Sequence, residues 1–310
     1  MIIHPGFVGI DVSKPMLDVF DAAIGRSECI DNTSAPIAAL VARWRSKDVF
    51  VLFEATGSYD RLLRDALTEA GIRFARVNPA RARDFARSAG FLAKTDAIDA
   101  RMLAAMAQCL APEPQAAANP VREQLARAHK RRDQLVYARQ KERTRRSECV
   151  DPDIAADIDD HLDWLDHKIV AWDREIDRLI QQSEELAQAA RRLRSMPGFG
   201  PVATTTLLAL MPELGTLSPK AAAAIAGLAP FNIDSGQFRG SRRIKGGRKR
   251  VRDALYMAAL AAARCNSRFR AFYRSLRAAG KPAKVAIIAV ARKLLITANA
   301  ILRDKSAYQR

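Results

Sequence analysis

The chain has 310 residues, of which 49% are hydrophobic, so it is long enough for two domains and can bury a sizeable core. This composition excludes wholesale disorder, and the longest uninterrupted apolar run, about ten residues (254–263), is far shorter than the roughly 18 that cross a bilayer. The net charge of +17 lies entirely in residues 195–310, which hold 21 Lys and Arg against 4 Asp and Glu. Because these basic residues are spread over several segments, nucleic acid is a better partner than a membrane surface.

Residues 1–110 alternate β-rich runs with helical stretches, which predicts an α/β domain. We expect helices at 37–46, 59–70 and 95–109 and strands at 7–11, 17–21, 28–30, 49–53 and 72–77. Gly71 is placed to end the second helix, and Thr95 to cap the third, with Asp96 in its first turn.

Residues 111–120 are rich in Pro and Ala and are typical of a linker. Two long helical patterns follow, at 121–148 and 154–186, within a predicted helical region of residues 111–190. Residues 121–150 carry a net charge of +6 and residues 151–190 of −9, which favours an antiparallel, coiled-coil-like pair over two solvated helices that do not pack. An apolar stripe on the second helix needs a partner helix, in this chain or in another protomer: Leu162, Leu165, Ile169, Trp172, Ile176 and Ile180.

Residues 191–310 form a predicted basic domain of short helices joined by Gly and Pro. The segment 194–203 contains Gly198 and Gly200 and has the form of a helix-hairpin-helix turn, whose backbone N–H groups would face a phosphate. The alternative interpretation is a plain glycine turn.

The four cysteines and four histidines are scattered, which argues against structural zinc and predicts reduced, mostly buried thiols. The N-terminus has no basic region of the kind that opens a secretory signal, so we expect a soluble cytoplasmic protein.

Four carboxylates are placed to converge. Asp11 and Glu54 end two apolar strands, so neighbouring strands would bring both to one edge of a sheet. Asp96 and Asp99 share one face of a helix. Converging carboxylates repel unless a cation lies among them, and hard oxygen ligands suit Mg²⁺, or Mn²⁺ as a second possibility. Taken singly, each acid also has a structural reading, as a strand-end residue or as a charge that complements a helix dipole.

Six of the ten residues 241–250 are basic. The run is either a loop that grips phosphates or a solvated, localisation-like charge run, and the basic surroundings favour the first. Few aromatic residues interleave with these charges, so stacking of bases, as in single-strand binders, is not supported. The candidate basic contacts to nucleic acid are Arg239, Arg242, Arg243, Lys245, Arg248, Lys249, Arg250, Lys281, Lys284, Arg292 and Lys293.

Ser235 lies in an Asp-Ser-Gly sequence, and spacing alone favours a turn serine. The sequence supplies no unambiguous His or Lys base for it. As a nucleophile it would need activation by the metal site or by surrounding arginines.

Several motifs in chain order resemble those of the insertion-sequence one-hundred-ten family of transposases, the DEDD-type, bridge-RNA-guided recombinases. The resemblance covers nearly the whole chain, and the motifs lie at 9–14, 54–57, 94–101, 196–200, 234–236 and 251–257. It implies a RuvC-like, ribonuclease H-fold domain (1–110), a linker and coiled-coil region (111–190), and a transposase domain (191–310).

The resemblance also implies roles for particular residues. The acidic positions of the family fall on Asp11, Glu54, Asp96 and Asp99, and its catalytic serine falls on Ser235. In the family this serine attacks a DNA phosphate and forms a covalent link, assisted by the Mg²⁺ site. Members act as dimers or as tetramers built from two dimers, with carboxylates and serine contributed by different protomers. A structured guide RNA selects the donor and target double-stranded DNA.

The sequence therefore predicts an RNA-guided DNA recombinase, cytoplasmic and bound to the bacterial nucleoid when active. The alternative is a metal-dependent junction resolvase or nuclease that hydrolyses DNA with water. A third class, a non-catalytic nucleic-acid-binding protein, would not need the carboxylates.

Overall fold

The computed structural model describes residues 2–55, 57, 59–91, 95–115, 119–231 and 242–309, and the backbone of 234–235 and 238–239. The chain forms two compact units, Met1–Ala117 and Ala118–Arg310. The second unit therefore contains both the pair of long helices and the basic C-terminal segment.

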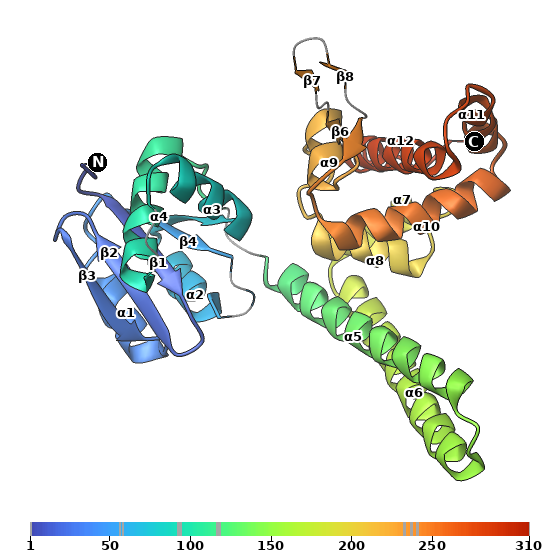
Figure 1. Cartoon of the computed structure of the whole chain (residues 1–310), viewed down its shortest axis with the longest axis horizontal. Helices are drawn as coiled ribbons and strands as arrows, with labels where there is room; N and C mark the ends of the chain where they lie inside the picture. Colours follow the sequence, from blue (N-terminus) through green and yellow to red (C-terminus); the bar gives the residue numbers. More distant parts are fainter. Residues whose placement is uncertain are drawn as a thin grey trace. The chain divides into compact units, whose positions relative to one another are not determined.

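The first unit is built on a mixed five-stranded sheet with the order β3-β2-β1-β4-β5 (Figure 1). The strands β1 to β3 form an antiparallel meander, and β4 and β5 continue the sheet in parallel with β1. The strand bounds are β1 Phe7–Val12, β2 Met16–Asp21, β3 Arg26–Asp31, β4 Phe50–Glu54 and β5 Arg73–Val77. All five predicted strands are thus present, with small shifts at their ends.

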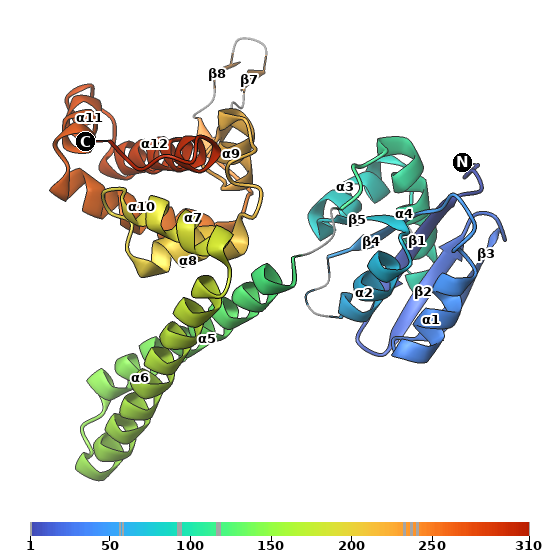
Figure 2. The same cartoon turned by 180° about the vertical axis from the view of Figure 1, so that it is seen from behind.

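Helices cover both faces of this sheet (Figure 1 and Figure 2). Alternate side chains of β1 and β4, such as Ile10 and Phe53, point into one core with α1 and α2, while Phe50 and Leu52 point into the other with α3 and α4. The helix bounds are α1 Ser34–Ala42, α2 Arg61–Glu69, α3 Pro79–Ser88 and α4 Asp96–Leu110.

The predicted helix ends are confirmed in two places. Gly71 follows the C-cap of α2 with φ +68°, a left-handed conformation that glycine adopts without strain. The Thr95 hydroxyl accepts a hydrogen bond from the backbone N–H of Ile98 and so caps α4. The helix expected at 37–46 instead begins at Ser34 and ends at Ala42, and α3 was not expected at all.

The second unit begins with the two long helices, α5 Pro120–Glu148 and α6 Pro152–Gln181, which pack along each other. Ion pairs cross between them, as Arg132 with Asp173 (2.6 Å) and Arg146 with Asp159 (2.9 Å) show. The apolar stripe of α6 faces α5, where Leu165 and Ile169 are buried against Leu135. The packed pair matches the charge pattern of the sequence, and solvated helices that do not pack are ruled out.

The remainder of the second unit is a helical bundle that shares one apolar core with the near ends of α5 and α6. Its helices are α7 Glu184–Arg194, α8 Pro201–Leu210, α9 Pro219–Ile225, α10 Lys249–Cys265, α11 Ser267–Ala278 and α12 Ala283–Arg303. Two short ribbons, β6 Pro230–Phe231 with β9 Arg243–Ile244 and β7 Asp234–Ser235 with β8 Phe238–Arg239, lie between α9 and α10 in the chain. The helix expected at 154–186 was too long, because α6 ends at Gln181 and the Ser183 hydroxyl caps a new helix.

The C-terminal helix α12 has an apolar 18-residue window that meets the length and composition of a membrane span. The sequence of α12 contains no long uninterrupted apolar run, because Arg292 and Lys293 interrupt its apolar residues. Half of that window is buried, and Leu294 and Leu295 lie in the core of the second unit.

Candidate metal centre and nucleic-acid interface

Asp11 and Glu54 lie side by side at the ends of β1 and β4. The parallel register pairs Ile10 with Phe53, so the next residues along each strand are Asp11 and Glu54. Paired residues of neighbouring strands share a face, and here that face is opposite to the one that buries Ile10 and Phe53. The sheet therefore brings both carboxylates to one edge and one face, as the sequence predicted.

The helix α4 supplies the other two carboxylates by crossing β1 directly over Gly9. A Cβ built at Gly9 would lie 1.9 Å from the backbone oxygen of Ala100 and 2.4 Å from the backbone nitrogen of Ala104. Only glycine permits this approach. Since residues two apart on a strand share a face, the helix that covers Gly9 also reaches Asp11.

Carboxylate oxygens of Asp11, Asp96 and Asp99 all lie within 4.8 Å of one another. Burial, followed in order of influence by the negative charges of Asp99, Asp96 and Glu54, raises the pKa of Asp11 from 3.8 to about 6. Four acids from two strands and a helix thus share one electrostatic field. The available ligand atoms are all carboxylate oxygens of partly exposed side chains, and such oxygens fit a hard divalent cation such as Mg²⁺ or Mn²⁺.

Asp18 is a further acid at this edge that the sequence analysis did not single out. The antiparallel register of β1 and β2 pairs Asp11 with Asp18, and that of β2 and β3 pairs Asp18 with Cys29. Partial desolvation raises the pKa of Cys29, and so do a hydrogen bond to Asp18 and the charges of Asp18 and Asp96. The pairing register, which a single sequence does not reveal, is the signal that would have identified Asp18.

None of the four cysteines forms a disulfide, but the expectation that most of their side chains are buried is wrong. Cys29, Cys109 and Cys265 are exposed, and Cys149 is half-buried. Cys29 belongs to β3, the outermost strand of the sheet, where a side chain has no neighbouring strand on one side.

We expect that replacing Gly9 with Ala lowers divalent-metal affinity at least about tenfold and destabilises the protein by roughly 1–3 kcal/mol, the usual cost of overpacking. The added methyl group would push α4, and with it Asp96 and Asp99, away from Asp11. Calorimetric titration with Mn²⁺ and thermal denaturation measure the two effects. The control is Gly200→Ala, where a Cβ meets nothing within 4 Å and φ is −86°. Unchanged Mn²⁺ affinity in Gly9→Ala would contradict this account of how the carboxylates are assembled.

Ser235 belongs to β7 in the second unit, where the structure describes only its backbone, paired with Phe238 of β8. Its side chain and that of Arg239 lie outside the described residues. The glycines of the 194–203 turn are described: Gly200 is the N-cap of α8, and Gly198 has φ +82°. A Cβ at Gly198 would lie 2.2 Å from the backbone oxygen of Ala258, so this glycine is required where the turn packs on α10.

Three of the candidate basic residues have acid partners close by. Arg250 pairs with Asp133 of α5, with Nη2 to Oδ1 at 2.8 Å, and Arg248 pairs with Glu213 at 2.7 Å. Lys249 lies 2.6 Å from Asp253. The Arg250 pair joins α10 to the long helices and packs beside the buried His129. Arg250 and Arg248 therefore link α10 and its N-cap to distant parts of the second unit, whereas the Lys249 pair lies within α10.

The other basic residues divide into two groups. Lys293 lies over the ring of Phe272 at 4.4 Å, a cation–π contact, and Lys245 is exposed. Five more line a single pocket in the second unit: Arg242, Arg243, Lys281, Lys284 and Arg292. Sequence position alone could not separate these groups, because the partners come from distant parts of the chain.

Residues 8–151 match a transposase family of the DEDD IS110 type, and residues 190–274 match the transposase family IS116/IS110/IS902. The chain is 27% identical over 315 residues to a pilin gene-inverting protein from Moraxella bovis, covering 98% of each chain. It is 33% identical over 150 residues to a 42 kDa protein of insertion element IS900 from Mycobacterium paratuberculosis, covering 46% of this chain and 38% of the relative.

Proposed function

The chain belongs to the IS110 family of transposases and is an enzyme that cuts and rejoins DNA, and from this premise we propose that it is an RNA-guided recombinase with a serine nucleophile and a divalent-metal site. The observation that carries the metal part of the proposal is the convergence of Asp11, Asp96 and Asp99, with Glu54 at the adjacent strand end. The arrangement of sheet and helices in the first unit supports a ribonuclease H-like fold.

In this proposal Asp11, Glu54, Asp96 and Asp99 hold Mg²⁺ or Mn²⁺. The bound ion supplies positive charge that stabilises the phosphate as negative charge develops on its oxygens. The carboxylates fix its position, and the partial burial of Asp11 reduces the screening of its charge by water. Asp18, at the next position across the sheet, adds to the negative field that attracts the cation.

Ser235 acts as the nucleophile. Its Oγ forms a bond to phosphorus as the bond to one deoxyribose oxygen breaks; the serine hydroxyl loses its proton to solvent, and the departing deoxyribose oxygen takes up a proton from solvent. A deoxyribose hydroxyl of the second DNA then attacks the phosphoserine and releases Ser235. Because each broken phosphodiester is exchanged for another ester, strands are rejoined without an external energy source. A resolvase that hydrolyses DNA with water would not conserve the phosphate ester bond in this way.

The positive charge and the exposed apolar side chains of the second unit indicate its partners. Donor and target DNA and a structured guide RNA are polyanions, and the charge excess of residues 195–310 supports their binding to the second unit. Exposed apolar side chains on the long helices, Tyr137 and Trp164 among them, support assembly into a dimer or a dimer of dimers. Such an assembly would let one protomer supply the carboxylates and another the serine, in the bacterial cytoplasm on the nucleoid.

Purification of the protein from cells that carry its element, followed by sequencing of the bound RNA, tests the guide. We expect one discrete structured RNA that restores exchange between donor and target DNA when it is added to RNA-free protein. Efficient recombination by RNA-free protein would contradict RNA guidance and leave the other parts of the proposal standing.

A further inference from the structure

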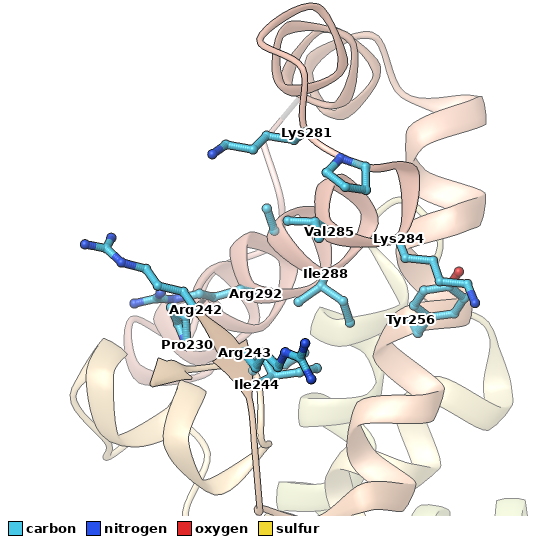
Figure 3. A pocket seen from close by; sticks show the side chains of 13 residues that line it. Pro230, Arg242, Arg243, Ile244, Tyr256, Lys281, Lys284, Val285, Ile288 and Arg292 are labelled. Carbon is cyan, nitrogen blue, oxygen red and sulfur yellow. The ribbon is translucent and has the colours of Figure 1, made fainter. Parts of the chain in front are cut away.

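A large pocket opens on the second unit. Its volume is about 1130 Å³, and its walls come from the segment before β6, the β6–β9 ribbon, α10 and the start of α12 (Figure 3). Pockets for single small molecules usually measure roughly 300–1,000 Å³. The size therefore suits part of a polymer better than a single metabolite.

The pocket combines an apolar floor with a basic rim. The floor includes Leu228, Ile244, Val285, Ile288 and the ring of Tyr256. The rim consists of Arg242, Arg243, Lys281, Lys284 and Arg292, whose side chains surround the floor in Figure 3. No Asp or Glu is among the described residues that line the pocket. The occupant that complements this surface is anionic and carries a bulky apolar group.

An unpaired nucleotide has this chemistry. In a duplex the phosphates face outward but the bases stay stacked inside, so a duplex would engage the rim and leave the floor empty. A nucleotide out of the stack places its base against apolar and aromatic side chains and its phosphate against Lys or Arg. Val285 is 52% exposed within the pocket, which leaves apolar surface for a base to cover.

The pocket also adjoins the part of the chain that carries Ser235. Pro230 and Phe231 of β6 pair with Ile244 and Arg243 of β9, and the β7–β8 hairpin lies between these two strands in the chain. The wall of the pocket and the hairpin therefore belong to one stretch of the chain, residues 230–244.

We propose that this pocket binds an unpaired nucleotide of a nucleic-acid strand, with the base on the apolar floor and the flanking phosphates on the basic rim. The proposal rests on the proposed function only in assigning nucleic acid to the second unit. Tyr256, whose place beside the basic residues is not evident from sequence order, supplies the aromatic face that the basic run itself lacks.

The test compares Val285→Glu with Met257→Glu in the full-length protein. Both residues are exposed apolar side chains of the same unit, but only Val285 lines the pocket. Fluorescence anisotropy measures the affinity of each variant for single-stranded DNA, single-stranded RNA and duplex DNA of one sequence. We expect Val285→Glu to weaken single-strand binding by about tenfold, the scale of losing one stacked base. The Met257→Glu variant should stay within about twofold of wild type for every probe, and Val285→Glu should lose less duplex affinity than single-strand affinity.

Abasic substitution identifies what occupies the floor. Removing bases from the single strand should weaken binding to wild type and have no further effect on Val285→Glu. Comparison of the single-stranded DNA and single-stranded RNA probes shows which of the two nucleic acids the pocket binds. Equal affinity of wild type for abasic and intact strands would overturn the proposal. It would also be overturned if an acidic peptide displaced the strand and Val285→Glu weakened the binding of the peptide but not that of the strand. If the removal of bases weakens binding as expected but the protein does not recombine DNA, the proposed function is refuted and the pocket assignment stands.

Discussion

Replacement of Asp11 with Asn reduces DNA strand cleavage by roughly a thousandfold or more, because a divalent cation contributes several kcal/mol of charge stabilisation at a reacting phosphate. Asp11 lies at the centre of the cluster, within reach of both Asp96 and Asp99. Cleavage of a labelled donor DNA in Mg²⁺, followed over time, measures the loss. Wild-type cleavage by Asp11→Asn would exclude the carboxylates from the chemistry.

The same variant should be more stable than wild type when no metal is present. The pKa of Asp11 rises from 3.8 to about 6 in the folded protein, so folding disfavours its charged form. The metal-free wild type therefore loses stability as the pH rises from about 4 through about 6, whereas Asp11→Asn does not. We expect a gain of roughly 1 kcal/mol for the variant at pH 7.5, after allowance for solvent screening, and no gain at pH 4.

Thermal denaturation in EDTA at the two pH values measures this difference. Asp65→Asn is the control, since Asp65 is an exposed carboxylate of α2 outside the cluster. Saturating Mg²⁺ should reverse the order and make the wild type the more stable protein. A variant that is less stable than wild type at pH 7.5 in EDTA would show that the carboxylates do not repel one another.

Replacement of Ser235 with Ala abolishes recombination and the covalent protein–DNA adduct together, while Mn²⁺ binding and thermal stability stay unchanged. The loss is complete in this account because no other hydroxyl can hold the phosphate between the two exchange steps. Recombination of a donor–target plasmid pair and gel analysis of denatured protein–DNA adducts are the two readouts. Ser241→Ala, a matched change in the same stretch of sequence, should retain both activities.

The Ser235→Ala variant also separates the proposed recombinase from a resolvase. A resolvase activates water, so its products are free ends and its rate does not depend on this serine. Full strand cleavage by Ser235→Ala, without an adduct in the wild type, would favour the resolvase.

The strands and the carboxylates could be predicted because they depend on local patterns. Apolar runs ending in Asp11 and Glu54 indicate strand ends, and Thr95 indicates where α4 begins. The convergence itself depends on Gly9, whose role is visible only once α4 lies across β1. Sequence spacing suggested that the four acids meet. Helix packing explains how Asp11, Asp96 and Asp99 come within 4.8 Å of one another, and the strand register places Glu54 at the adjacent strand end.

The weaker predictions failed where local patterns are ambiguous. The helix α3 fully buries only Ala82, with Phe85 and Ala86 partly buried beside it, so its apolar stripe is short, although Asn78 caps it and Pro79 begins it. The break between α6 and α7 is a single serine cap, Ser183, within a continuous helical pattern.

The basic residues show a further limit of reasoning from sequence. Asp133 and Arg250 are 117 residues apart in the chain, yet they form an ion pair between α5 and α10. Arg242, only eight residues from Arg250, instead lines the pocket with Lys281 of the loop before α12. Long-range packing decides which of two neighbouring arginines joins two helices and which lines the pocket.

The most direct test of the central claim is to trap the covalent protein–DNA adduct and identify the modified residue by mass spectrometry, with and without divalent metal. The account predicts a phosphodiester link to Ser235 that forms in Mg²⁺ or Mn²⁺, is absent in EDTA, and is absent in Asp11→Asn. An adduct on another residue, or one that forms equally well in EDTA, would contradict the account.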